Sequence, residues 1–195
     1  MTSENNQERF YNTMLELASQ IKINAKTIES HDVLNTIDLI LQIYNSKNRI
    51  FVYGAGRSGF IGRCFAQRLM HLGIKSCFVS DAVTHQYTSK DLLIIVSGSG
   101  ETTSTVAISK KAKEIGGKIV SLINNPKSTI GLLSDFVIEI KGKSKDVVLN
   151  HKSLAPYTSL FDISALAVLD SIGGILMVKL NIKEEDINKR HASIE

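Results

Sequence analysis

The sequence predicts an α/β domain in which helices cover both faces of a parallel sheet. Short segments that are apolar throughout and rich in β-branched residues recur along the chain, as is typical of buried parallel strands. Segments of about 10 to 15 residues with helical periodicity separate them, as in successive βαβ units. Glycine-rich turns follow several of the apolar segments. A length of 195 residues suits a single domain of this class, spanning residues 1–195.

The first 46 residues are expected to be helical. Apolar residues follow helical spacing in two successive segments, 15–28 and 33–44. Neither glycine nor proline occurs before Gly54, so no strong helix breaker lies in this region. We therefore expect residues 1–46 to form helices that precede the α/β core.

The α/β core is expected to span residues 47–142. Its strands are predicted at residues 49–53, 75–80, 91–96, 118–123 and 136–140. Helical periodicity over 58–72 and 103–115 predicts the helices between them, and each of these ends at glycine. Residues 143–195 are expected to form a polar loop, a long apolar helix from Ser159 to near Leu180, and a short helix over 183–190. This order indicates a doubly wound domain with extra helices at both ends.

Composition and charge exclude several functional classes. The net charge is only +4 and aromatic residues make up 6%, so the chain lacks the dense basic face of a nucleic-acid binder. The N-terminus is too polar for a signal peptide. Asp170, Ser171 and Lys179 interrupt the longest apolar segment, which argues against a membrane span. Two cysteines without a C-x-x-C pair favour a reducing compartment. We expect a cytoplasmic protein without membrane or nucleic-acid partners.

Two loops rich in glycine and hydroxyl residues carry the clearest chemistry. Gly54-Ala-Gly-Arg-Ser-Gly59 follows the first strand, and Ser97-Gly-Ser-Gly-Glu-Thr102 follows the third. In a parallel sheet both loops lie at the carboxyl edge, where ligands bind. Glycines let an anion approach the backbone N–H groups of a helix N-terminus, and hydroxyls add donors. We expect these loops to bind a phosphate. No metal is expected, because the five histidines form no H-x-x-x-H motif and no cluster with cysteine.

The sequence of these loops allows two other interpretations. Gly54, Gly56 and Gly59 fit the G-x-G-x-x-G pattern of nicotinamide dinucleotide sites, but Asp81 lies beyond the usual distance of the ribose-binding acid. The second loop could simply form a turn and cap the next helix. Three hydroxyls within six residues favour a monophosphate pocket over both.

These segments resemble the sugar isomerase (SIS) domain family, and within it the 6-phospho-3-hexuloisomerases. The resembling segments are residues 54–73, 97–102 and 125–131 and the closing Arg190-His191-Ala192. The resemblance implies a flavodoxin-like three-layer α-β-α sandwich and a homo-oligomer, typically a tetramer. It also implies interconversion of D-arabino-3-hexulose 6-phosphate and fructose 6-phosphate without a metal or organic cofactor. The family's phosphate contacts fall here on Ser58, Ser97, Ser99 and Thr102.

Moving a carbonyl to the neighbouring carbon requires a base that takes a proton from carbon. Where the family carries Phe-Glu at the start of the long C-terminal helix, this chain has Phe161-Asp162. Asp162 is therefore expected to be the base, although an aspartate there could simply interact with the helix dipole. Glu101, beside the second loop, is a second candidate carboxylate. The family match makes His191 a candidate proton shuttle that reaches into a neighbouring subunit's pocket.

Three more residues are expected to contact the substrate. Gly56 and Arg57 belong to the first loop, and Arg57 could instead form an ion pair at a subunit interface. His85 lies in the loop 81–87, where the family has a Glu followed by a Thr-rich loop, and it could shuttle protons or bind sugar hydroxyls.

The departures from the family pattern leave two alternatives open. Besides the loop 81–87, Pro156-Tyr157-Thr158 replaces a Met-Gly segment of the family. The first alternative is an isomerase for another phosphosugar, such as a pentose or amino-sugar phosphate. The second is a phosphosugar sensor without catalysis, although no helix-turn-helix pattern precedes residue 50.

Overall fold

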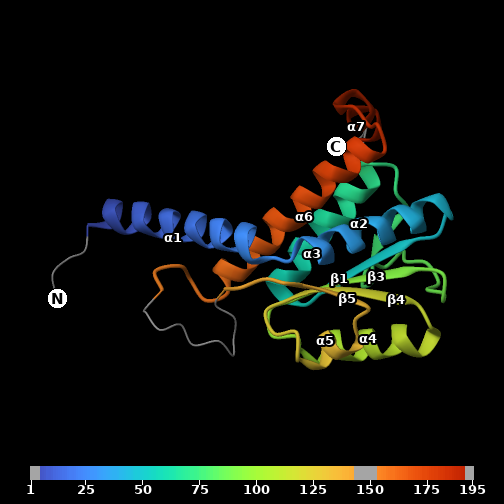
Figure 1. Ribbon diagram of the computed structural model, residues 1–195, viewed down its shortest axis with the longest axis horizontal. Helices are drawn as coiled ribbons and strands as arrows, with labels where there is room; N and C mark the ends of the chain where they lie inside the picture. The colour runs from blue at the N-terminus through green and yellow to red at the C-terminus, as the bar shows by residue number, and fades with distance from the viewer. Residues whose placement is uncertain (1–4, 143–152, 192–195) are drawn as a thin grey trace.

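A computed structural model describes residues 5–142 and 153–191 as a three-layer α/β/α domain (Figure 1). The sheet has five parallel strands in the order β2-β1-β3-β4-β5, which is the flavodoxin-like order. The strands are β1 (Ile50–Gly54), β2 (Ser76–Phe78), β3 (Leu92–Ser97), β4 (Lys118–Ile123) and β5 (Phe136–Glu139). The expected fold class is confirmed.

The central strand β3 explains why the sheet could be predicted. All six of its residues are buried, because β1 and β4 flank it and helices cover both faces. Its register pairs Leu92 with Ile50 of β1 and with Lys118 of β4. A strand buried on both faces needs a continuous apolar sequence, which is the pattern observed.

Helices divide between the two faces of the sheet (Figure 1). One face is covered by α2 (Ser30–Asn45), α3 (Gly56–His71) and α6 (Ser159–Lys179), which share a large apolar core with the strands. The other face is covered by α4 (Thr103–Ile115) and α5 (Thr129–Leu133) over a smaller core. The helix α5 was not predicted, because five residues are too few to show helical periodicity.

Several boundaries differ from the sequence prediction, and β1 and β3 are each displaced by one residue. Helix α3 begins at Gly56 rather than Ser58, because the chain turns directly from β1 into the helix. Strand β2 covers three residues instead of six and pairs with β1 alone at the edge of the sheet. Strand β5 ends at Glu139.

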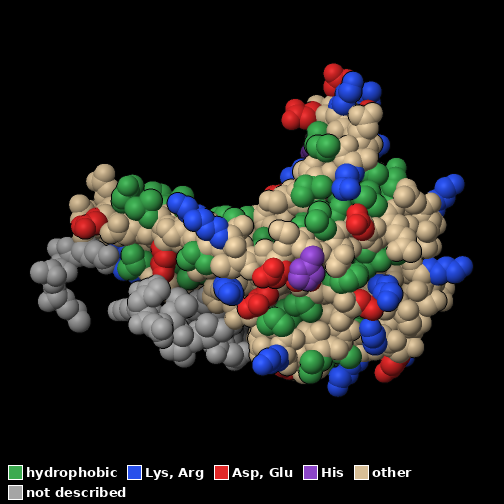
Figure 2. All heavy atoms as spheres, viewed as in Figure 1, with side chains coloured by type: hydrophobic (Ala, Val, Ile, Leu, Met, Phe, Trp, Pro, Cys, Tyr) green, Lys and Arg blue, Asp and Glu red, His purple; other side chains and the backbone are tan. Residues whose placement is uncertain are grey.

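The terminal helices extend beyond the sheet. Helix α1 (Asn6–Thr27) projects away from the sheet, and α7 (Glu184–Arg190) follows the far end of α6 (Figure 1). The outer part of α1 exposes Phe10, Tyr11, Met14 and Leu15, and Figure 2 shows apolar side chains along this projection. Among the described residues, one helix, α6, has the length and the apolar composition that could cross a membrane. Because it packs against α1, α2 and α3 and contributes to the core, we interpret it as a core helix of the domain.

Candidate active site

The two glycine-rich loops meet between β1 and β3, where the strand order changes direction. A cavity of about 250 Å³ lies there, and its lining comes from both loops and from the start of α6. Six of the site residues predicted from the sequence line it: Gly56, Arg57, Ser58, Ser97, Ser99 and Thr102. We refer to this cavity, with its lining residues, as the switch-point pocket. Its position is the one at which open parallel sheets bind ligands.

Glycine is required where the two loops turn. A Cβ atom on Gly54 would lie 2.7 Å from the backbone oxygen of Ser58 and 2.8 Å from that of Val96. Gly100 has φ +69°, and a Cβ atom there would lie 2.0 Å from Ser128 Oγ. Neither position can accept a side chain, so Gly54 allows β1, β3 and α3 to approach closely, and Gly100 allows the second loop to approach Ser128 before α5.

The hydroxyls of the second loop keep their donors available. Ser97 Oγ accepts the N–H of Gly100 at 3.2 Å, and Ser99 Oγ accepts the N–H of Glu101 at 3.2 Å. A serine hydroxyl that accepts a hydrogen bond still has its own hydrogen to donate. Thr102, the N-cap residue of α4, makes no side-chain capping hydrogen bond. These three groups lie at a helix N-terminus and could donate to an anion.

Asp162 lies directly behind the wall of the switch-point pocket. Its side chain is 1% exposed, and Oδ2 accepts from Arg57 Nε at 2.8 Å and from Thr158 Oγ1 at 2.7 Å. Ser58 Oγ is 3.4 Å from Oδ1. All three partners line the pocket, while Asp162 itself is buried beneath them. The structure thus joins the predicted base to the first loop of the predicted phosphate site and to Thr158 at the start of α6.

Glu101 has a different environment. Its carboxylate accepts the N–H of Thr129 at 2.6 Å and the hydroxyl of Thr129 at 2.7 Å, at the start of α5. These hydrogen bonds, with that of the Thr129 backbone the stronger influence, lower the pKa of Glu101. The side chain does not line the switch-point pocket. Its contacts connect the second loop to α5.

His85 lines another cavity, of about 180 Å³, over the face of the sheet that α4 covers. The surroundings are mainly apolar, and the Tyr87 ring packs edge-on against Phe51 with ring centroids 5.1 Å apart. Burial, and secondarily the charge of Asp91, raises the pKa of the Tyr87 hydroxyl. Within one chain, therefore, His85 is not brought together with the two loops.

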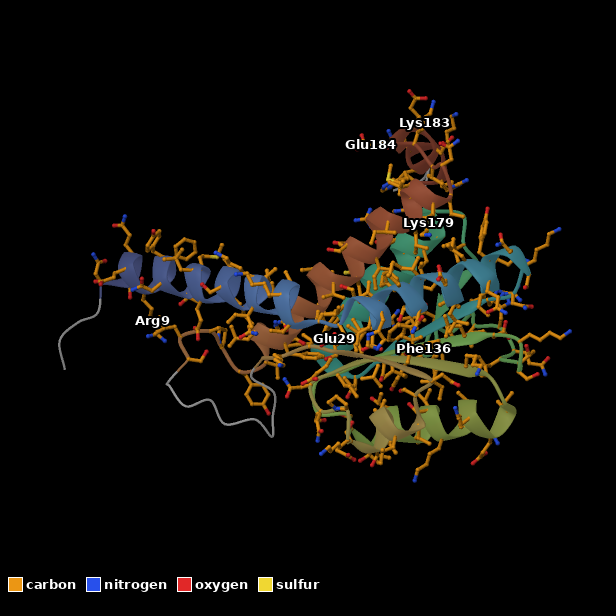
Figure 3. All side chains as sticks on the ribbon, viewed as in Figure 1. Arg9, Glu29, Phe136, Lys179, Lys183 and Glu184 are labelled. Atoms are coloured by element: carbon orange, nitrogen blue, oxygen red, sulfur yellow. The ribbon has the colours of Figure 1, made fainter. Side chains whose placement is uncertain are left out.

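His191 also lies away from the switch-point pocket. It caps the C-terminal end of α7, and its ring stacks on that of His71 with centroids 4.3 Å apart. The 21 residues of α6 separate the pocket from this region, a length of roughly 30 Å. Figure 3 shows Lys179, Lys183 and Glu184 at this distant end. A role for His191 in catalysis therefore requires the pocket of another subunit.

The structure adds a third wall that the sequence prediction missed. Tyr157, Thr158 and Phe161 line the switch-point pocket from the start of α6. Tyr157 has φ 36°, which is rare for a bulky residue. The only signal in the sequence was the departure of residues 156–158 from the family pattern. Among the described residues, no group of three or more His, Cys, Asp or Glu side chains is arranged to hold a metal.

Comparison with known proteins identifies the class. Residues 42–167 match the family described as the SIS domain. The chain belongs to the SIS domain family, and the predicted resemblance is confirmed.

Individual relatives narrow the comparison. The chain is 35% identical over 178 residues to the 3-hexulose-6-phosphate isomerase of Methanocaldococcus jannaschii, covering 91% of this chain and 94% of the relative. The 3-hexulose-6-phosphate isomerase of Bacillus subtilis is 35% identical over 181 residues, with 92% and 96% covered. A crystal structure from Methanococcus jannaschii, for which the function of 3-hexulose-6-phosphate isomerase was inferred, matches with a TM-score of 0.78 and 36% identity over 92% of this chain and 97% of that one.

Proposed function

We propose that the protein is a phosphosugar isomerase that interconverts D-arabino-3-hexulose 6-phosphate and fructose 6-phosphate. The observation that supports this best is the convergence of Ser58, Ser97, Ser99 and Thr102 in one pocket at the N-termini of two helices. Such a site suits a phosphate monoester. The identity of the sugar is inferred from relatives named 3-hexulose-6-phosphate isomerase, which align over more than nine-tenths of the chain.

In the proposed reaction, the two loops anchor the phosphate while a base acts on the carbon chain of the sugar. The base takes the proton from C2 of the 3-hexulose, and the electron pair forms an enediolate with the C3 carbonyl. Return of a proton to C3 and transfer of the C2 hydroxyl proton to the C3 oxygen give fructose 6-phosphate. Asp162 is the proposed base, since it contacts Ser58 and Thr158 of the pocket wall and Arg57 is its counter-ion. No redox cofactor is needed to balance this step.

The proposal includes assembly. A homotetramer in the cytoplasm is the expected state, and in it His191 of one subunit would approach the pocket of a neighbour to move protons between the sugar oxygens. The exposed apolar residues of α1 supply a surface on which subunits could associate.

Fructose 6-phosphate in deuterated water gives the direct test. The wild-type protein is expected to incorporate deuterium at C3 and to form the 3-hexulose, both followed by NMR of the sugar protons. A substrate that stays unlabelled and unconverted would contradict the assignment. A panel of pentose and amino-sugar phosphates would then test the alternative substrates. Binding of a phosphosugar without conversion of any of them would favour a sensor.

Replacing Ser97 with alanine is expected to raise the KM for the sugar phosphate by about tenfold, with a smaller effect on kcat. Ser97 is buried, and its hydroxyl holds the Gly100 N–H as well as facing the pocket. A hydrogen bond to a charged group contributes about 1.5 to 3 kcal/mol, and the lower end of this range corresponds to a change of about tenfold. Ser104 is the exposed second residue of α4 and does not line the pocket, so Ser104→Ala is the matched control and should leave KM unchanged. An unchanged KM for Ser97→Ala would contradict the binding of the phosphate by this loop.

A further inference from the structure

Glu16 ties the projecting helix α1 to the third wall of the switch-point pocket. Its Oε2 atom accepts the backbone N–H groups of both Leu154 and Ala155, each at 2.8 Å. Glu16 is partly buried and Ala155 is 3% exposed. Two N–H donors directed at one carboxylate oxygen form charge-assisted hydrogen bonds, which are shorter and stronger than neutral ones. The two hydrogen bonds join residues that lie 138 and 139 positions apart in the sequence.

The two residues that Glu16 holds lead directly into the pocket. Pro156 follows Ala155, and proline fixes its own backbone φ angle. Tyr157 comes next, with φ 36°, and its side chain lines the pocket while remaining 58% exposed. A bulky residue keeps such a backbone conformation only where the surrounding structure imposes it. Two sets of contacts impose it. On one side Glu16 accepts the N–H groups of Leu154 and Ala155, and on the other the Ser159 N–H, in the first turn of α6, donates to Pro156 O at 2.9 Å.

Thr158 extends this connection to the proposed base. Its hydroxyl donates to Asp162 Oδ2 at 2.7 Å, and its carbonyl accepts the N–H of Asp162 at 2.9 Å. Only Pro156 and Tyr157 separate the clamped Ala155 from Thr158. A displacement of residues 154–155 would therefore move both the wall that faces the sugar and the side chain that orients Asp162.

We propose that Glu16 is a positioning residue of the active site. By fixing Leu154 and Ala155, it places Tyr157 against the bound sugar and Thr158 against Asp162, which makes Tyr157 a contact of the sugar portion of the ligand. The two glycine-rich loops follow β1 and β3, whereas the hydrogen bonds of Glu16 to Leu154 and Ala155 hold the segment that leads into α6. Loss of Glu16 should thus affect recognition of the sugar and its turnover, and should spare recognition of phosphate alone. This inference rests on the proposed function for the identity of the ligand.

The test compares Glu16→Ala with Glu16→Gln and Gln20→Ala. Glutamine keeps an acceptor oxygen at the same position, so it should retain most of the wild-type behaviour. Gln20 lies one turn further along α1 and donates to Lys141 O at 2.8 Å, so Gln20→Ala removes a hydrogen bond to the backbone from the same helix without touching residues 154–158. Thermal unfolding of each variant shows whether the fold is kept. If Glu16→Ala does not fold, Glu16→Asp replaces it, because its carboxylate is one methylene too short to reach both N–H groups.

Calorimetric titration with inorganic phosphate and with fructose 6-phosphate gives a readout that does not depend on turnover. For Glu16→Ala we expect fructose 6-phosphate affinity and kcat/KM to fall roughly 30-fold, a loss typical of a displaced binding wall, while phosphate affinity stays within twofold. Glu16→Gln should remain within about threefold of the wild type, since it loses only the charge of the acceptor. Gln20→Ala should match the wild type in both titrations.

Two results would overturn the inference. One is an unchanged affinity and turnover for the sugar phosphate in Glu16→Ala. The other is an equal loss of phosphate and sugar-phosphate affinity that glutamine does not rescue, which would indicate general damage to the fold. A wild-type protein that binds fructose 6-phosphate without converting it would contradict the proposed function alone, because the ratio of the two affinities still decides the role of Glu16. A wild-type protein that binds neither ligand would contradict both.

Discussion

Replacing Asp162 with asparagine is expected to lower kcat by about 10²- to 10⁴-fold, the range that a general base contributes, with little change in KM. Asparagine has nearly the shape of aspartate and its amide oxygen can still accept from Thr158, which holds Oδ2 at 2.7 Å. It cannot take a proton from carbon at neutral pH. Steady-state rates and deuterium exchange into fructose 6-phosphate measure the effect, and exchange should fall as far as turnover.

Glu101→Gln is the matched control for this prediction. Glu101 is the other carboxylate next to the phosphate loops, but its two hydrogen bonds with Thr129 direct it to the start of α5. The kcat of Glu101→Gln should stay within a few-fold of the wild-type value. If Asp162→Asn instead raises KM and leaves kcat intact, Asp162 serves only to hold Arg57, whose Nε lies 2.8 Å from its carboxylate. If Glu101→Gln abolishes deuterium exchange and Asp162→Asn does not, Glu101 is the base instead of Asp162.

The sequence predicted those parts of the site whose pattern is local. Each phosphate loop lies directly between a buried strand and a helix, so its position follows from the order of elements in a parallel sheet. The glycine-rich loops after β1 and β3 therefore predicted one phosphate pocket, and the family resemblance implied Ser58, Ser97, Ser99 and Thr102 as its phosphate contacts; all four line the cavity.

The remaining parts of the site depend on contacts between distant segments. Nothing local in the sequence shows that α6 begins at the carboxyl edge of β1 and β3, so Tyr157 and Thr158 were missed as pocket residues. The hydrogen bonds of Glu16 span more than 130 positions and leave no periodic signal. His85 was expected near the sugar because it lies in the loop 81–87, which departs from the family pattern, but β2 is the edge strand and the loop covers the opposite face of the sheet from α3.

The close packing of α3 against β1 leads to the prediction with the largest expected effect on stability. A Cβ atom on Gly59 would lie 2.6 Å from the backbone oxygen of Gly54, the last residue of β1. Neither backbone can move without shifting the strand or the helix that forms the first phosphate loop. Gly59→Ala is therefore expected to lower the free energy of unfolding by about 3 kcal/mol, as overpacking of a rigid contact does. Denaturant titration followed by circular dichroism measures it.

Gly174→Ala makes the same chemical change with the opposite expected sign. Gly174 lies inside α6, and a Cβ atom there would have no heavy atom within 4 Å, so only the helix propensity changes. Alanine should raise the free energy of unfolding by about 0.5 to 1 kcal/mol. Equal effects of the two substitutions would show that close packing does not explain Gly59. A destabilised Gly59→Ala that keeps full phosphate affinity would show that the first loop tolerates a displaced helix, and Ser58 would then not be fixed by the β1–α3 contact.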